Sequence, residues 1–106
     1  MKEAELQKLV LDYLKKKKGY FVWRSYVGPI VRGRTKILSP NPMAGFPDIF
    51  GFNENNKPFA IELKSQTGKL SDKQVSWLQN LKAKGVHCIV ARDLETVIIE
   101  LAKIPL

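Results

Sequence analysis

Residues 48–64 have the sequence DIFGFNENNKPFAIELK, and this stretch decides the fold class. Two short runs of strand-forming composition, 48–52 and 59–64, flank the Asn-rich segment 53–58, which is typical of a turn. The stretch therefore predicts a pair of neighbouring strands joined by a turn.

The second of these strands alternates apolar and charged residues. Ile61 and Leu63 would face the core, and Glu62 and Lys64 would project together from the opposite face. Asp48 opens the first strand, so two carboxylates lie on adjacent strands. Rigidly held oxygen ligands suit a hard divalent cation, and a neighbouring lysine can orient an attacking water. The competing interpretation is an exposed cross-strand ion pair, which the Glu-x-Lys spacing by itself favours because such charge patterns arise freely on alternating strands.

Helical periodicity and strand-forming runs predict the other elements. The expected elements are a helix over 2–18, a strand over 20–25, a helix over 71–84, a strand over 86–91 and a helix over 93–103. Ser71 and Gln74 form a capping box at the start of the second helix, and Asp93 is expected to cap the third. The order helix, three strands, helix, strand, helix predicts an α/β fold around one central mixed sheet, in a single domain over residues 1–106.

The segment 26–47 shows no periodicity. It contains several glycines and prolines, with Arg32, Arg34 and Lys36 among them. A loop of this length is uncommon in a compact domain unless it is functional or flexible. We expect such a loop here, with room for a short strand around 35–38.

The chain is strongly basic. Its 106 residues include 18 Lys and Arg against 10 Asp and Glu, which gives a net charge of +8. That balance is typical of a domain that binds a polyanion, although a soluble, self-repelling surface gives the same count. Basic residues in or beside loops near the two carboxylates are candidate phosphate contacts, although surface solvation explains any one of them taken singly. They are Arg24, Arg32, Arg34, Lys36, Lys69 and Lys73.

Composition excludes several classes of protein. The apolar runs are far shorter than the ~20 residues of a membrane-spanning helix, so we expect no membrane partner. The single Cys88 excludes a disulfide framework and, with the single His87, cannot supply a structural zinc site of about four ligands. The N-terminal residues carry charges where a signal peptide is apolar. We therefore expect a cytoplasmic protein.

Several short motifs occur in an order that resembles a known family. They are Glu3-Ala4-Glu5-Leu6-Gln7, Gly45-Phe46-Pro47-Asp48, Glu62-Leu63-Lys64, Ser71-x-x-Gln74-x-x-Trp77-Leu78 and Leu81-x-x-x-Gly85. Together they resemble the VRR-NUC (virus-type replication-repair nuclease) branch of the PD-(D/E)XK superfamily, over residues 3–91. The resemblance implies a restriction-endonuclease-like core and a metal-dependent DNA nuclease. Small stand-alone relatives, often phage-encoded and so located in the host cytoplasm, resemble junction-resolving enzymes that act as homo-oligomers.

The resemblance also implies a role for each motif residue. Asp48 and Glu62 would hold Mg²⁺, or Mn²⁺ as a substitute, with the backbone carbonyl of Leu63 as a further ligand. Lys64 would lie beside the nucleophilic water. Glu3 would hold a metal-bound water or a second ion.

Helix geometry indicates which glutamate of the first helix faces inward. Glu3 falls within roughly 50° of the centre of the apolar stripe, whereas Glu5 lies about 110° away, so the geometry favours Glu3. On the second helix, the resemblance implies that Gln74 is the polar residue that completes the site. The alternative is that Gln74 serves only the capping box, which already explains a glutamine at this position. Trp77 is expected to pack in the core rather than to stack on a base.

The expected function is Mg²⁺-dependent, structure-selective cleavage of branched DNA, with Holliday junctions as a possible substrate. Two symmetric incisions require a homodimer or a higher even oligomer, for which the segments 26–47 and 97–101 offer candidate contact surfaces. One alternative is a non-catalytic, basic nucleic-acid-binding module on the same fold. Another is a less selective nuclease of DNA or RNA.

Overall fold

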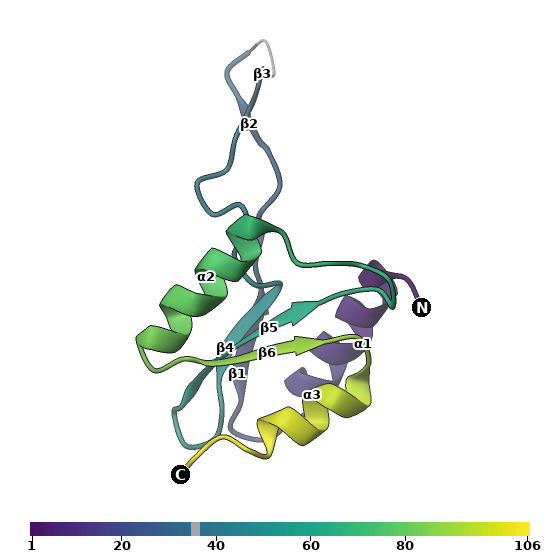
Figure 1. Ribbon diagram of the computed structural model, residues 1–106, viewed down its shortest axis with the longest axis vertical. Coiled ribbons are helices and arrows are strands. Elements are labelled where there is room, and N and C mark those ends of the chain that lie inside the picture. Colours follow the sequence, from purple (N-terminus) through teal and green to yellow (C-terminus); the bar gives the residue numbers. More distant parts are fainter. Residues whose placement is uncertain (35–36) are drawn as a thin grey trace.

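The computed structural model describes residues 1–34 and 37–106, which form a sheet with helices on both faces and a separate hairpin (Figure 1). In chain order the elements are α1 (Glu3–Lys15), β1 (Phe21–Arg24), β2 (Ile30–Arg32), β3 (Ile37–Ser39), β4 (Ile49–Phe52), β5 (Pro58–Leu63), α2 (Asp72–Ala83), β6 (His87–Ala91) and α3 (Leu94–Leu101). The predicted α/β fold class is confirmed.

The central sheet has the strand order β1-β4-β5-β6. The predicted strand pair β4–β5 is antiparallel, with Ile49 opposite Ile61, and β6 runs parallel to β5, with Ile89 opposite Ile61. The turn between β4 and β5 forms because the side-chain oxygen of Asn53 accepts hydrogen bonds of 2.9 Å from the backbone N–H groups of Asn55 and Lys57. Because β6 runs parallel to β5, the carboxyl ends of these two strands lie at the same edge of the sheet.

Helices α1 and α3 cover one face of the sheet, and α2 lies on the other (Figure 1). The core lies on the α1–α3 side, where the buried stripe of α1 (Leu6, Val10 and Leu14) meets alternate residues of the strands. Helix α2 contributes no fully buried residue, so it covers its face less completely than α1 and α3 cover theirs.

The expected long loop over 26–47 contains a hairpin that the sequence analysis missed. Strands β2 and β3 pair antiparallel, with Val31 opposite Leu38, and the hairpin projects away from the body of the protein (Figure 1). The short strand expected around 35–38 corresponds in part to β3. Val31 and Leu38, which lie opposite each other, are both exposed, so their face of the hairpin is not buried and imposes no apolar period on the sequence. Lys36 lies outside the described residues.

The helix ends follow the predicted capping chemistry, with one difference. The capping box of Ser71 and Gln74 is present, and the Asp93 side chain accepts a hydrogen bond from the Thr96 N–H. Helix α1 ends at Lys15 rather than at residue 18, because the next residues form turns that lead to Gly19 at a positive φ of 82°.

Candidate active site

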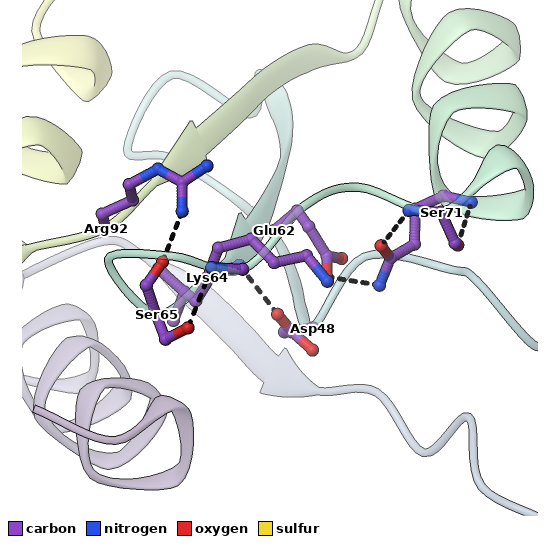
Figure 2. Close-up of polar contacts among 9 residues, drawn as sticks. Asp48, Glu62, Lys64, Ser65, Ser71 and Arg92 are labelled. Carbon is purple, nitrogen blue, oxygen red and sulfur yellow. Dashed lines mark hydrogen bonds and ion pairs between the residues drawn. The ribbon is translucent and has the colours of Figure 1, made fainter.

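Asp48 and Glu62 face each other across β4 and β5. Asp48 directly precedes β4, whose first residue Ile49 lies opposite Ile61, so its side chain comes beside that of Glu62, the next residue of β5. The Asp48 carboxylate is fixed to the neighbouring strand, since its Oδ2 accepts a hydrogen bond of 2.7 Å from the backbone N–H of Leu63 (Figure 2). The two carboxylates are therefore held together by the sheet itself.

The segment before Asp48 is fastened to α2. Gly45 has a positive φ of 89°, and a Cβ there would lie 2.8 Å from the Cβ of Lys73 and 2.9 Å from its carbonyl carbon. The ring of Phe46 packs edge-on against Trp77, with centroids 5.1 Å apart, and the indole N–H of Trp77 donates to the carbonyl of Ala44 at 3.1 Å. The Gly-Phe-Pro-Asp motif thus seats the start of β4 against α2. Trp77 is half-buried and packs on Phe46 outside the hydrophobic core, so the expectation that it packs in the core is wrong, because α2 covers the face of the sheet opposite to that core.

Gln74 links the first turn of α2 to the carboxylate pair. Its side-chain oxygen accepts a hydrogen bond from the Ser71 N–H at 2.9 Å, and its side-chain N–H₂ donates to Oε1 of Glu62 at 3.0 Å. The two roles that the sequence offered as alternatives coexist, because each uses a different end of the same amide.

Lys64 lies beside Glu62 with its Nζ 3.9 Å from Oε1 (Figure 2). Glu62 is 2% exposed and Lys64 is 8% exposed. The pair is therefore not the solvated surface ion pair of the competing interpretation. Removing two charged groups from water is costly unless close partners compensate for the lost hydration. Here both side chains lie at the edge of the sheet beside Asp48.

The carboxylate pair is electrostatically frustrated. Burial, followed by the negative charge of Asp48, raises the pKa of Glu62 to about 8. Burial also raises the pKa of Asp48, although the hydrogen bond from the Leu63 backbone opposes that rise. Without a cation, the two groups together retain a proton near neutral pH. A hard divalent cation would remove this conflict, so the donor set fits Mg²⁺ or Mn²⁺.

The third acid lies nearby without completing a cluster. Glu3 is half-buried in the first turn of α1, and its charge contributes to the raised pKa of both Asp48 and Glu62, whereas Glu5 is exposed. Within residues 1–34 and 37–106, no three His, Cys, Asp or Glu side chains converge as a metal-binding group. Two carboxylates are what Mg²⁺ commonly takes from a protein, since it keeps several water or phosphate ligands.

The candidate phosphate contacts lie on several different elements, and Arg24 is the one that shares a hollow with a site carboxylate among the residues that the structure describes. Arg24 ends β1 and lines a hollow of about 470 Å³ together with Asp48 and Gln7. Lys69 is exposed in the connection before α2, and Lys73 is exposed in the first turn of α2. Arg32 and Arg34 belong to the hairpin, which leaves the body at the end of the sheet that carries Asp48 (Figure 1).

Arg92 is a residue of this edge that the sequence analysis missed. Its guanidinium donates to the backbone carbonyl of Ser65, whose hydroxyl in turn accepts from the Gly68 N–H (Figure 2). Arg92 therefore braces the connection that follows Lys64. Its position directly after β6 is the signal that could have revealed it, since β6 pairs parallel with β5 and ends at the same edge.

Comparisons with known proteins support the fold and its family. The sequence model of the VRR-NUC domain matches residues 1–93. The chain belongs to the VRR-NUC family. This family has a PD-(D/E)XK-type nuclease domain, so the predicted family is confirmed. No curated protein matches the sequence.

Two solved structures share the fold of this VRR-NUC domain. One is a "VRR_NUC domain" that is 16% identical, with 97% of each chain covered and a TM-score of 0.70. The other is a "VRR_NUC domain protein" that is 18% identical, with 98% of this chain and 88% of that chain covered and a TM-score of 0.66. Within the described part of the chain, no helix is long and apolar enough to cross a membrane.

Proposed function

We propose that this VRR-NUC domain hydrolyses phosphodiester bonds of DNA with the help of Mg²⁺ or Mn²⁺. The observation that supports this most directly is the pair formed by half-buried Asp48 and buried Glu62, whose raised pKa values reflect a site short of positive charge. Burying charged groups beside a lysine is generally less favourable than burying an apolar pair of similar volume, so stability alone does not explain this arrangement.

Each site residue has a role that its contacts support. Asp48 and Glu62 would hold the cation, with the carbonyl of Leu63 as a further oxygen ligand. The bound cation would lower the pKa of a coordinated water and neutralise charge on the scissile phosphate. Lys64 orients the attacking water and offsets developing negative charge. Gln74 fixes the orientation of Glu62 through Oε1. Glu3, whose charge is felt by both carboxylates, would hold a metal-bound water or a second ion.

The basic residues and the oligomeric state would determine which substrate is bound and cut. Arg24, Lys69, Lys73 and the hairpin arginines position the phosphate backbone, because phosphate contacts set register without reading sequence. Branched DNA, including four-way junctions, is the proposed substrate, and a homodimer or higher even oligomer supplies the paired incisions. The exposed residues Val31 and Leu38 of the hairpin and Ile98 and Ile99 of α3 offer apolar contact surface.

The test combines several substrates with one site variant. Supercoiled, linear, four-way-junction and RNA substrates are incubated with Mg²⁺, Mn²⁺ or EDTA. We expect cleavage with either metal, none in EDTA, and faster cleavage of the junction than of the linear duplex. Glu62→Gln should be inactive, whereas Glu95→Gln, which removes an exposed acid from α3, should retain full activity. Binding without any cleavage would instead identify a non-catalytic module, and equal rates on all substrates a general nuclease.

A further inference from the structure

An aromatic hollow of about 370 Å³ lies beside the candidate active site. It is lined by Trp23, Arg24, Ser25, Tyr26, Met43 and Phe46. Three of these six side chains are aromatic, one is a thioether and one is a guanidinium. Among the described residues of its wall there is no acidic side chain.

This hollow adjoins the hollow that contains Asp48. The two share Arg24, Ser25 and Tyr26 as a common wall. The backbone N–H of Ser25 donates a hydrogen bond of 2.8 Å to the carbonyl of Asp48, so the wall is tied directly to the residue that carries a site carboxylate. A group held in the aromatic hollow therefore lies next to the phosphate that the site would engage.

The apolar wall is accessible to solvent. Tyr26 is 69% exposed, Met43 is 40% exposed and Trp23 is 39% exposed. Exposed side chains of this size in one concave place are characteristic of a binding surface, since water contact with them is unfavourable.

The rings are held in place before any partner arrives. Trp23 packs against Phe50 with centroids 5.5 Å apart, and Phe46 packs against Phe50 at 5.8 Å. The hydroxyl of Tyr26 donates to the carbonyl of Pro29 at 2.6 Å. A ligand that stacks here would not have to order the rings, so less conformational entropy opposes its binding.

We propose that this hollow binds an unpaired nucleobase of the substrate strand. The inference rests on the nuclease function proposed above and deepens it, because it names the substrate feature that the enzyme recognises. Aromatic faces stack on any base without sequence preference, and the Arg24 guanidinium can stack or hold the adjoining phosphate. Met43 supplies an adaptable apolar contact.

Charge favours nucleic acid over a second copy of the chain as the occupant. The protein carries a net charge of +8, and the hollow itself contributes Arg24. Two identical copies meeting here would bring like charges together, whereas a nucleotide brings a negative phosphate with its apolar base. The consequence is a preference for DNA with an unpaired nucleotide beside the cut, as occurs at branch points.

The experiment measures binding in EDTA, where no cleavage occurs. Three duplexes are compared: one with a single unpaired base, one with an abasic residue at that position, and one fully paired. We expect roughly tenfold tighter binding of the unpaired base than of the abasic counterpart, and a ratio that persists at high salt because stacking is not screened. Equal affinity for the first two duplexes would overturn the inference.

Tryptophan fluorescence locates the binding. The chain has two tryptophans, Trp23 and Trp77, and stacking on Trp23 should quench its emission. Trp23→Phe should keep the affinity and lose the quenching, while Trp23→Ala should lose the preference for the unpaired base. Leu9→Ala, which removes a 40% exposed apolar side chain from α1, should change neither.

The outcomes separate this inference from the nuclease proposal. Base-dependent quenching without cleavage in Mg²⁺ would support the hollow and refute the nuclease function. Cleavage in Mg²⁺ with no dependence on the unpaired base would do the reverse. A Trp23→Ala protein that changes from dimer to monomer in light scattering would identify the hollow as a subunit interface, and would also overturn the inference.

Discussion

The side-chain amide of Gln74 donates a hydrogen bond of 3.0 Å to Oε1 of Glu62 while its oxygen caps α2 through the N–H of Ser71. One side chain thus connects the start of a helix to a carboxylate on the central strand β5. Because α2 buries none of its residues completely, this polar link contributes to the placement of α2 as well as to the orientation of Glu62.

The two functions of Gln74 can be separated by substitution. Ser71→Ala removes only the cap and should lower the free energy of unfolding by about 1 kcal/mol with activity retained. Gln74→Glu keeps an acceptor for the Ser71 N–H but places a carboxylate against Glu62, so it should retain the helix and lose most activity. Thermal unfolding and cleavage rates measured on both variants test this. Equal losses of activity in the two variants would contradict it.

The stability of the metal-free protein should depend on pH through Glu62. The folded chain retains this proton up to about pH 8, whereas the ordinary value for the side chain is 4.5. Between these values the folded state binds more protons than the unfolded state, so the free energy of unfolding falls as the pH rises and levels off above about pH 8. Glu62→Gln does not titrate and should be the more stable protein at pH 8 by roughly 2–4 kcal/mol. Denaturant unfolding at pH 5 and pH 8 in EDTA measures the difference, and parallel behaviour of the two proteins would refute it.

Divalent cation should stabilise the protein through the same pair. Mg²⁺ binds the folded site and replaces the retained proton, so at ten times its dissociation constant it should add about 1.4 kcal/mol. Asp48→Asn and Glu62→Gln should each lose this stabilisation. Unfolding temperatures with and without Mg²⁺ provide the measurement, with Glu95→Gln as the control variant. A full Mg²⁺ response in both site variants would place the cation elsewhere.

The sheet and helices were predictable because burial imposes a period on the sequence. The alternation of Ile61 and Leu63 with charged residues located β5, and the capping chemistry of Ser71 located α2. The hairpin was not predictable by this route, since Val31 and Leu38 are both exposed and burial does not constrain the spacing of these two residues. Its two strands pair with each other, and strand pairing is not visible in single-residue patterns.

The carboxylates and the lysine of the site were also predictable from strand periodicity, whereas the contacts that depend on tertiary arrangement were not. The period of a strand puts Glu62 and Lys64 on one face, and the short connection between β4 and β5 brings Asp48 opposite them. The contact from Gln74 depends on the rotation of α2 relative to the sheet, which no local pattern determines. Arg92 was missed because its place at this edge follows from the parallel pairing of β5 with β6, which is a property of topology.

Gly45 should be sensitive to substitution, and Gly85 offers a matched control. Both have a positive φ, 89° and 91°, but a Cβ at Gly45 would collide with the backbone of Lys73, whereas one at Gly85 meets nothing within 4 Å. Gly85→Ala should therefore cost about 1 kcal/mol from backbone strain alone, and Gly45→Ala roughly 2–4 kcal/mol. Gly45→Ala should also displace Asp48 and reduce cleavage. Equal destabilisation of the two variants would show that the loop does not press on α2.

Lys64 should separate chemistry from binding. Its ammonium lies at the carboxylate pair and the residue is 8% exposed, so it contributes little to the surface charge that attracts DNA. Lys64→Met keeps the aliphatic packing and removes the charge, and it should reduce the cleavage rate about 100-fold or more. Its affinity for DNA and the slope of that affinity with salt should stay close to those of the wild type, because the exposed basic residues still neutralise the phosphates.

Lys103→Met, which removes an exposed lysine paired with Glu100 on α3, should leave the cleavage rate unchanged. Binding in EDTA over a salt series, run beside cleavage in Mg²⁺, compares the two variants. A Lys64→Met protein that binds DNA weakly in proportion to its lost activity would show that Lys64 holds the substrate rather than assisting the reaction.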